Sequence, residues 1–355
     1  MSIFLNEKYK NLEVYTPGEQ PQDMKYIKLN TNESPYPPSP GVVAAINAEQ
    51  IENLRLYSDP ECNKLREAMA NLYGVKKENI YLSNGSDDIL NFSVMAFCSD
   101  NTPAAFPEIS YGFYKVFAEL HNVTYKTIPL KEDFSIDYKD YMGLNSFIVI
   151  ANPNAPTGRY LSLEEIEQII KGNPNNVVLI DEAYIDFGGE SVYPLTKRYK
   201  NLIVVGTFSK SRSMAGARLG FAIADQDLID DLNRIKYSTN PYNINRLTLA
   251  AGEAAIKEDR YYKENCKRII NTREYTQKNL CDLGFTVVPS KANFIFAKSD
   301  KISGQALYEN LKKRGILVRH FNMSKINDYN RITIGTVEEM QTFIKTVKEI
   351  LEEVK

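Results

Sequence analysis

The sequence predicts an α/β protein with a large, mostly parallel sheet domain, a smaller α+β domain and an N-terminal arm. Between about residues 76 and 235, short runs of consecutive apolar residues alternate with helical patterns. Strands that are apolar at every position are typical of a parallel sheet covered by helices on both faces. After about residue 240, a long helical pattern, several strand-like segments and a final helix follow, which favours an α+β unit.

The chain before residue 76 is expected to hold an arm, an irregular segment and two helices. Residues 1–29 lack sustained periodicity, and the proline-rich stretch 30–41 cannot form regular structure. Apolar residues at helical spacing predict helices over about 41–54 and 60–73. The expected organisation is an N-terminal arm (1–29), an N-terminal part of the small domain (30–54), a large α/β domain (55–240) and a C-terminal small α+β domain (241–355).

The centre of the large sheet is expected at three apolar runs, residues 147–150, 177–180 and 202–205. A helical pattern over 161–172 separates the first two, with Ser162 as its N-cap three residues before Glu165. Farther along, the pattern predicts helices over 246–280 and 338–354. Strands are expected between those helices, within residues 284–290, 293–299, 315–321 and 331–336.

Composition excludes several classes of protein. The 355 residues include 43 Lys and Arg and 45 Asp and Glu, a net charge of −2. Nucleic acid and anionic membranes need a basic surface, so neither is an expected partner. Four scattered cysteines and two histidines make a metal site improbable and fit a reducing compartment. The N-terminus lacks a signal-peptide core and no apolar run approaches roughly 18 residues, so we expect a cytoplasmic protein.

Polar residues with distinct chemistry follow each of the three apolar runs. The first run leads into the amide-rich loop 152–158, the second into Asp181 and Tyr184, and the third into Ser209 and Lys210. Ligands of an open parallel sheet bind beyond the carboxyl ends of its strands. These side chains are therefore expected to surround one ligand.

A Gly85-Ser86 turn before a helical pattern adds an anion site, because free N–H groups and the positive end of the helix dipole face the ligand. An anion site, an acid and a lysine amine match the needs of pyridoxal phosphate. Its phosphate binds at a helix N-terminus, its ring nitrogen pairs with an acid and its aldehyde reacts with an amine.

The sequence resembles the fold-type I aminotransferases that depend on pyridoxal phosphate, and among them the histidinol-phosphate aminotransferase branch. The resemblance spans nearly the whole chain and implies that family's fold. Eight motifs in family order carry it: NTNESPYPPSP, LYSDP, SNGSDD, FPEISYGFY, NPNAPTG, IDEAYIDF, TFSKSRSMAGARLGF and RITIGT.

The resemblance implies a role for each matched residue. Lys210 would bind the cofactor aldehyde covalently, Asp181 would keep the ring nitrogen protonated, Tyr184 would bond the phenolic oxygen and Tyr111 would stack on the ring. The cofactor phosphate would be held by the turn at Gly85, by the N–H groups of Ser86 and Asp87, and by Ser209 and Arg218. Tyr57 would reach that phosphate from the other subunit of a homodimer. Arg331 would bind the anionic end of the substrate, with Tyr15 and Arg319 beside it.

Two positions depart from the family pattern. The asparagine that precedes Pro-Thr-Gly in the family is Ala155 here, so either Asn154 bonds the phenolic oxygen instead or that contact rests on Tyr184 alone. The usual Arg-Tyr-Pro reads Leu56-Tyr57-Ser58, which leaves the tyrosine in place without its arginine.

The expected reaction is ping-pong amino transfer between L-histidinol phosphate and 2-oxoglutarate in histidine biosynthesis, with Lys210 as general base. The first substrate has a phosphate in place of a carboxylate, and the two arginines Arg319 and Arg331 suit a phosphate dianion better than a single arginine does. An aromatic aminotransferase using Arg331 alone and a phosphothreonine decarboxylase of the same fold are the alternatives. A non-catalytic member of the fold is the least favoured, because such proteins generally carry an added DNA-binding module or lack the lysine. The partners expected are an amino donor, a 2-oxo acid and a second copy of the chain, with no metal.

Overall fold

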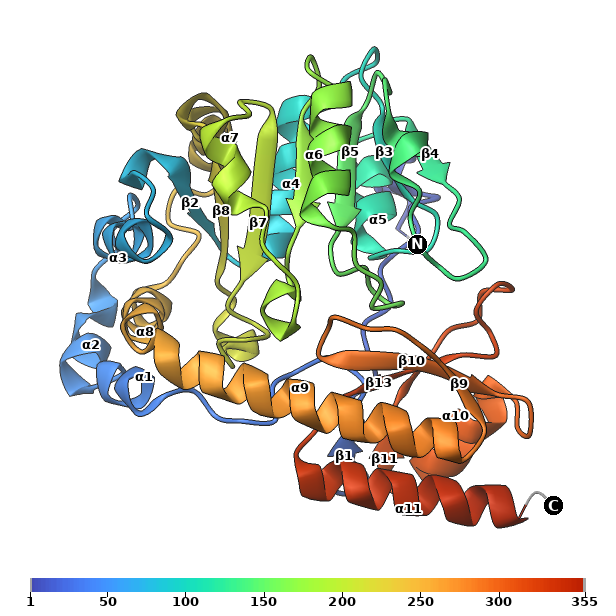
Figure 1. The fold of residues 1–355 in the computed structure, drawn as a ribbon. Helices are drawn as coiled ribbons and strands as arrows, with labels where there is room; N and C mark the ends of the chain where they lie inside the picture. Colours follow the sequence, from blue (N-terminus) through green and yellow to red (C-terminus); the bar gives the residue numbers. More distant parts are fainter. Residues whose placement is uncertain (1, 354–355) are drawn as a thin grey trace.

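A seven-stranded sheet forms the centre of the computed structural model, which describes residues 2–353 (Figure 1). Its strands lie in the order β2-β8-β7-β6-β5-β3-β4. All neighbours pair in parallel except β8, which is antiparallel to both β2 and β7. The strands are β2 (Ile80–Ser83), β3 (Ala104–Pro107), β4 (Tyr125–Ile128), β5 (Phe147–Ala151), β6 (Val178–Asp181), β7 (Leu202–Thr207) and β8 (Gly220–Ala224). The predicted parallel α/β sheet is confirmed.

Helices cover both faces of this sheet. Phe147 and Val149 of β5 pack in one apolar cluster with α4 (Ser86–Phe97), α5 (Phe113–Leu120) and α7 (Gln226–Thr239). Ile148 and Ile150 point the other way, toward α6 (Leu163–Gly172). The predicted cap of α6 is confirmed, since the Ser162 hydroxyl accepts from the Glu165 N–H at 3.2 Å. Burial on both faces explains why these strands are apolar at every position.

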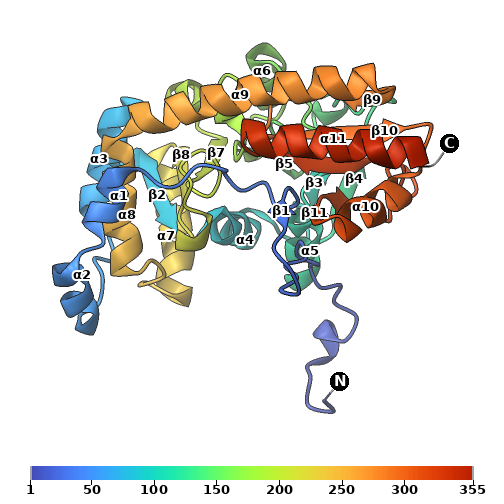
Figure 2. The ribbon, with the colours of Figure 1, turned by 90° about the horizontal axis from the view of Figure 1, so that it is seen from below.

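The small domain contains a four-stranded antiparallel sheet in the order β12-β13-β10-β9. Three helices and a separate two-stranded sheet complete the domain. In that sheet the N-terminal strand β1 pairs in parallel with β11. In Figures 1 and 2, α9 and α11 lie side by side along this domain, and α9 extends back toward the large sheet. The elements are β1 (Ile27–Lys28), α9 (Asp259–Asp282), β9 (Phe285–Val288), β10 (Phe294–Ser299), α10 (Gly304–Lys313), β11 (Ile316–Leu317), β12 (Arg319–His320), β13 (Asn330–Thr333) and α11 (Val337–Glu353).

Two predicted helices are divided in the structure. The helix expected over 41–54 consists of α1 (Pro40–Ala45), α2 (Ala48–Glu52) and a 3₁₀ turn, whereas α3 (Asn63–Tyr73) forms as predicted. The pattern over 246–280 is split into α8 (Arg246–Lys257) and α9. Glu258 between them has non-helical angles (φ −105°, ψ 35°), and its carboxylate accepts from the Gly41 N–H at 2.9 Å. The bend lets α8 pack on α1 and α3 while α9 crosses to the small domain.

The segment 30–54, expected in the small domain, has contacts on both sides. Val42 of α1 packs in the cluster of α3, α8 and β8 at the large sheet, whereas the Asn32 N–H donates to the Thr333 hydroxyl of β13 in the small domain at 3.0 Å. Residue 354, the end of the predicted last helix, lies outside the described residues. None of the helices within residues 2–353 has the length and apolar character needed to cross a membrane. Short 3₁₀ turns lie at Glu7–Tyr9, Asn53–Arg55, Lys77–Asn79, Tyr138–Tyr141, Ile185–Phe187, Tyr193–Lys197 and Ala215–Ala217.

Gly220 of β8 provides a test of the close approach between β8 and the turn before α4. A Cβ at Gly220 would lie 2.7 Å from the Gly85 carbonyl oxygen and closer still to the Ser86 nitrogen. We expect Gly220→Ala to lower the free energy of unfolding by about 1–3 kcal/mol, because backbone atoms must move. Gly216→Ala is the matched control: its Cβ would meet no atom within 4 Å, so a change within about 0.5 kcal/mol is expected. Equal effects in urea unfolding would contradict the close approach.

Candidate active site

The carboxyl ends of β5, β6 and β7 bring the predicted polar residues together. Ala151 of β5 pairs with Asp181 of β6, which in turn pairs with Val205 of β7. Lys210 follows β7 by three residues, and the loop 152–158 follows β5 directly. Register alone therefore places the amide loop, the carboxylate and the lysine at one edge of the sheet.

Asp181 is a buried carboxylate, only 5% exposed. Its Oδ2 accepts from the Tyr114 hydroxyl at 2.8 Å and its Oδ1 from the Ala183 N–H at 3.1 Å. Burial raises the pKa of Asp181 to about 6, while these hydrogen bonds and the Lys210 charge oppose the rise. The group is thus mostly ionised at neutral pH and oriented for a cationic partner. Tyr114 was not among the predicted site residues, although it lies in the matched FPEISYGFY motif three residues after Tyr111.

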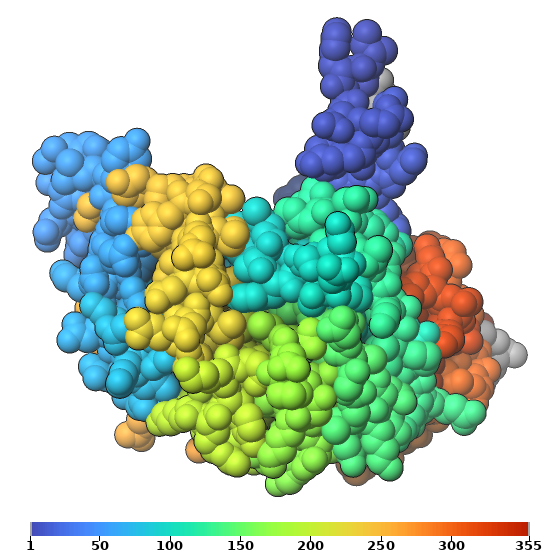
Figure 3. Space-filling view, turned by 90° about the horizontal axis from the view of Figure 1, so that it is seen from above, coloured from blue at the N-terminus to red at the C-terminus, as the bar shows by residue number. Residues whose placement is uncertain are grey.

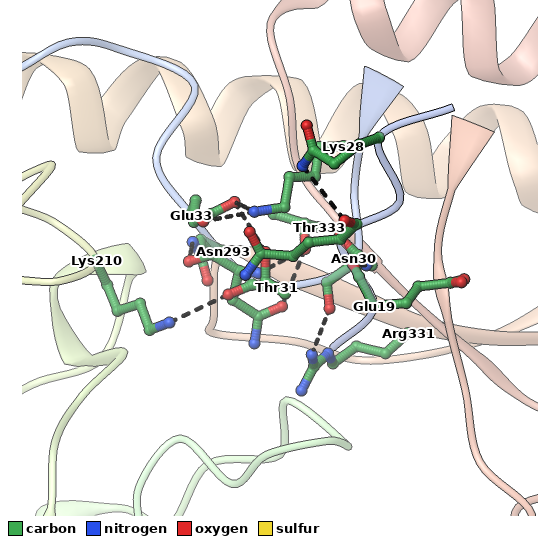
Figure 4. Close-up of polar contacts among 12 residues, drawn as sticks. Glu19, Lys28, Asn30, Thr31, Glu33, Lys210, Asn293, Arg331 and Thr333 are labelled. Carbon is green, nitrogen blue, oxygen red and sulfur yellow. Dashed lines mark hydrogen bonds and ion pairs between the residues drawn. The ribbon is translucent and has the colours of Figure 1, made fainter. Parts of the chain in front are cut away.

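Lys210 has its amine in the interior of the site. The Nζ atom lies 3.3 Å from the Thr31 carbonyl oxygen, as Figure 4 shows, and 5.7 Å from the centre of the Tyr184 ring. Burial lowers the pKa of Lys210 to about 8, and the positive charges of Arg331 and Arg218 add to this. A sizeable fraction of the amine is therefore neutral near physiological pH.

Tyr184 is buried against the small domain, with its ring edge-on to Phe294 at 5.0 Å between centroids. Its hydroxyl oxygen accepts from the Asn32 amide at 3.0 Å. Burial raises the pKa of Tyr184, so the hydroxyl keeps its proton. Asn32 belongs to the NTNESPYPPSP motif, but no sequence pattern relates it to a tyrosine 152 positions away.

The start of α4, where the anion site was predicted, lies beside Arg218. Gly85 has φ +84°, and a Cβ there would lie 2.6 Å from the Arg218 guanidinium. Within residues 2–353 no side chain caps the N-terminus of α4. The guanidinium donates to the Ser209 hydroxyl at 3.5 Å and to Asp87 Oδ2 at 2.9 Å. Only the N–H of Asp87 was predicted to take part. The structure adds its carboxylate, which also accepts from the Tyr111 hydroxyl at 2.9 Å.

Neighbouring residues occupy the Asn154 side chain, which was one of two candidates for the contact with the phenolic oxygen of the cofactor. Its Nδ2 donates to the Ile109 carbonyl at 2.9 Å and to the Thr157 hydroxyl at 3.1 Å, and its Oδ1 accepts from Ser110 at 2.8 Å. Both N–H groups of the amide are therefore occupied. Asn154 cannot replace the donor missing at Ala155 without breaking one of these bonds, which favours the alternative that rests on Tyr184.

Two arginines stand next to each other on the small sheet. Arg331 of β13 is paired in register with Arg319 of β12. Arg331 donates to the Asn30 carbonyl at 2.9 Å, and its buried Nε has no partner among the described residues. Arg319 donates to the carbonyls of Thr16 and Pro17 at 3.0 and 3.1 Å. Like charges side by side are unfavourable unless an anion binds them.

Tyr15 lies close to this pair, and Tyr57 does not. The Tyr15 ring stacks on Phe113 at 4.1 Å and meets Tyr111 edge-on at 6.1 Å. Burial raises the pKa of Tyr15, against the positive charges of Arg331 and Arg319. Tyr57 is 80% exposed and stacks on Tyr242 at 4.5 Å. Within residues 2–353, no hydrogen bond or ring contact joins Tyr57 to another predicted site residue.

Comparisons with known proteins agree with one another. Residues 24–347 match the family model described as "Aminotransferase class I and II". The chain is 53% identical over 352 residues to the histidinol-phosphate aminotransferase of Brachyspira hyodysenteriae, with 99% of each chain covered. It is 48% identical over 351 residues to that of Clostridium acetobutylicum, with 99% of this chain and 100% of the other covered. A solved histidinol-phosphate aminotransferase from Clostridium acetobutylicum has a TM-score of 0.84 and 26% identity, covering 92% of this chain and 99% of that one.

The lowered pKa of Lys210 predicts a pH-dependent cost to stability. The folded protein holds this proton less tightly than the unfolded chain, whose pKa is 10.5. The cost is therefore complete below about pH 8 and disappears as the pH rises toward 10.5. A pKa of about 8 corresponds to a cost of about 3 kcal/mol. We expect Lys210→Met to stabilise the ligand-free protein at pH 7 by up to that amount, and by progressively less above pH 8.

Urea unfolding at pH 7 and pH 9.5 measures this difference. The exposed Lys64 supplies the control, because Lys64→Met should change stability equally at both pH values. A Lys210→Met protein that is no more stable than the wild type at pH 7 would show that the amine is well hydrated.

Proposed function

This chain belongs to the class I and II aminotransferase family, and we propose that it transfers the amino group of L-histidinol phosphate to 2-oxoglutarate in histidine biosynthesis. The observation that carries the choice of substrate is the pair Arg319 and Arg331, adjacent on two strands without a carboxylate partner among the described residues. A phosphate dianion suits two guanidinium groups better than a carboxylate does. The names of the relatives at 53% and 48% identity support the same substrate.

The residues present fit pyridoxal 5′-phosphate as the cofactor. The cofactor phosphate would be held at the start of α4, where Gly85 leaves room beside Arg218 and Ser209. Asp181 would pair with the ring nitrogen and Lys210 would bind the aldehyde. The bound cofactor supplies an aldehyde that captures the substrate amine and a ring that takes up the electron pair released at Cα.

The side chains of the site move and hold protons around that chemistry. Lys210, with a pKa lowered to about 8, is available as a neutral base that accepts the proton from the substrate Cα. Asp181 is held in one orientation by Tyr114 and the Ala183 N–H, so its negative charge stays directed at one partner. The 2-oxo acid takes the amino group in a second half-reaction at the same site, with its carboxylate at Arg331.

A homodimer with shared active sites is part of the proposal. Exposed apolar side chains gather on α1, α2 and the turn after α2: Val43 (68%), Ile51 (54%), Leu54 (52%), Leu56 (47%) and Tyr57 (80%). The N-terminal arm also projects from the body in Figure 3 and exposes Phe4 at 88%. A second copy would cover these groups and bring Tyr57 to the neighbouring cofactor phosphate.

The cytoplasm is the proposed location, because the four free cysteines suit its reducing conditions.

A half-reaction screen tests the substrate. Protein loaded with pyridoxal phosphate is mixed with L-histidinol phosphate, phosphothreonine, phenylalanine or tyrosine, and the visible absorbance is followed. We expect L-histidinol phosphate to react with a kcat/KM at least about 100-fold above the aromatic amino acids, equivalent to roughly 3 kcal/mol from added charged hydrogen bonds. Lys210→Ala should retain the cofactor noncovalently without turnover. Release of carbon dioxide from phosphothreonine would instead identify a decarboxylase.

The arginine pair should affect the substrate and not the cofactor. We expect Arg331→Lys to raise the KM for L-histidinol phosphate about ten- to hundredfold, because an ammonium cannot replace the guanidinium fork. Arg319→Lys should have a smaller effect, since that side chain is more exposed. The Kd for pyridoxal phosphate should change less than about threefold in both. Arg260→Lys, in a surface pair with Glu264, is the control, and an equal loss of cofactor binding would indicate a structural role for Arg331.

A further inference from the structure

We infer that Asn32 is a positioning residue that makes the Tyr184 hydroxyl a hydrogen-bond donor toward the ligand. The inference rests on the proposed function, because the acceptor is taken to be the ring oxygen of the bound cofactor. It concerns a residue outside the matched set of site residues, in the proline-rich segment before α1. Asn32 does not face the reacting atoms itself and acts through Tyr184.

Asn32 is held on every side. It is 1% exposed and its backbone has φ +57°, a left-handed conformation that asparagine tolerates better than most residues. Its N–H donates to the Thr333 hydroxyl and its carbonyl accepts from the Asn293 amide, each at 3.0 Å. These contacts join the segment to β13 and to the residue before β10.

The Thr333 hydroxyl contacts the oxygen side of the Asn32 amide. This hydroxyl already accepts the Asn32 N–H, and it donates its single proton to Asn32 Oδ1 at 3.0 Å. The oxygen of the amide is thereby directed at Thr333. The Nδ2 group lies on the opposite side of the amide and donates to the Tyr184 oxygen at 3.0 Å.

Tyr184 is left with a proton to donate. Its oxygen accepts from Asn32, and no residue within 2–353 accepts from its hydroxyl. A buried hydroxyl proton is expected to find an acceptor. The Lys210 amine lies 5.7 Å from the centre of the Tyr184 ring, so this hydroxyl stands beside the residue that would bind the ligand. An acceptor in place of Nδ2 would draw the Tyr184 proton away from the ligand.

This arrangement compensates for a missing donor. Ala155 stands where the family pattern has an asparagine, and both N–H groups of the neighbouring Asn154 are used by Ile109 and Thr157. Tyr184 is thus the remaining side-chain donor for the ring oxygen among the residues assigned to that contact. The same short segment also touches two other site residues, since Asn30 accepts from Arg331 and Thr31 from Lys210 (Figure 4).

Two substitutions at Asn32 separate polarity from shape. Asn32→Asp keeps the shape and replaces the donor by an acceptor, whereas Asn32→Gly removes the amide and tolerates the left-handed backbone. We expect Asn32→Asp to raise the Kd of the dimeric protein for pyridoxal phosphate at least about tenfold, and Asn32→Gly by less. The pH midpoint of the bound cofactor's visible absorbance should move upward by about one unit in Asn32→Asp, because a lost donor disfavours the ionised ring oxygen.

The same two substitutions in a Tyr184→Phe background test whether Asn32 acts through the Tyr184 hydroxyl. Without the hydroxyl, Asn32→Asp and Asn32→Gly should each change the Kd less than about threefold. Effects that persist in Tyr184→Phe, or a larger loss in Asn32→Gly than in Asn32→Asp, would overturn the inference in favour of a purely structural role.

Thr333 keeps the inference testable if the Asn32 variants do not fold. Thr333→Val removes the hydroxyl that orients the amide and should raise the Kd about three- to tenfold, with a smaller upward shift of the pH midpoint. Thr333→Ser should restore both values within about twofold. Suppose that the wild type binds pyridoxal phosphate normally, and that Thr333→Val and Asn32→Asp leave both the Kd and the pH midpoint unchanged. That result would overturn this inference and leave the proposed function standing. A wild type that binds no pyridoxal phosphate would overturn the proposed function and this inference with it.

Discussion

The organisation of the site depends on the burial of ionisable groups at the carboxyl ends of three parallel strands. Desolvation raises the pKa of Asp181 to about 6 and lowers that of Lys210 to about 8. The two shifts bring both pKa values closer to neutral pH, so an ionised carboxylate and a partly neutral amine coexist near pH 7. Tyr114 moderates the first shift by its hydrogen bond, and the arginines of the site strengthen the second.

The segment 30–32 connects this strand edge to the small domain. Its three residues contact Arg331, Lys210 and Tyr184 through one carbonyl, a second carbonyl and one amide. A proline-rich chain that forms no helix or strand keeps its backbone groups available for such contacts. Residues 30–39 form no helix or strand, as predicted, whereas Pro40 and Gly41 begin α1. A regular element at residues 30–32 would use the same carbonyl groups internally.

Several predictions failed or stayed incomplete where distant parts of the chain compete for a residue. The pattern over 246–280 is helical throughout, but Glu258 bonds to Gly41 and interrupts it. Asn154 has the right side chain near the right place, yet Ile109 and Thr157 occupy its amide. Tyr114 lies within a matched motif, but its bond to Asp181 spans 67 positions. Periodicity reports which face of an element is buried and cannot report which partner a polar atom finds.

The sequence by itself determined the parallel sheet, the polar residues at its strand ends and the family. These features are local: apolar runs, the residue directly after each run and short motifs in a set order carry them. Only the tertiary structure decided that Arg319 lies opposite Arg331, that the Asn154 amide is occupied and that the Asn32 amide donates to Tyr184. Those facts depend on hydrogen bonds between residues up to about 300 positions apart, and bonds of that range leave no periodic trace in the chain.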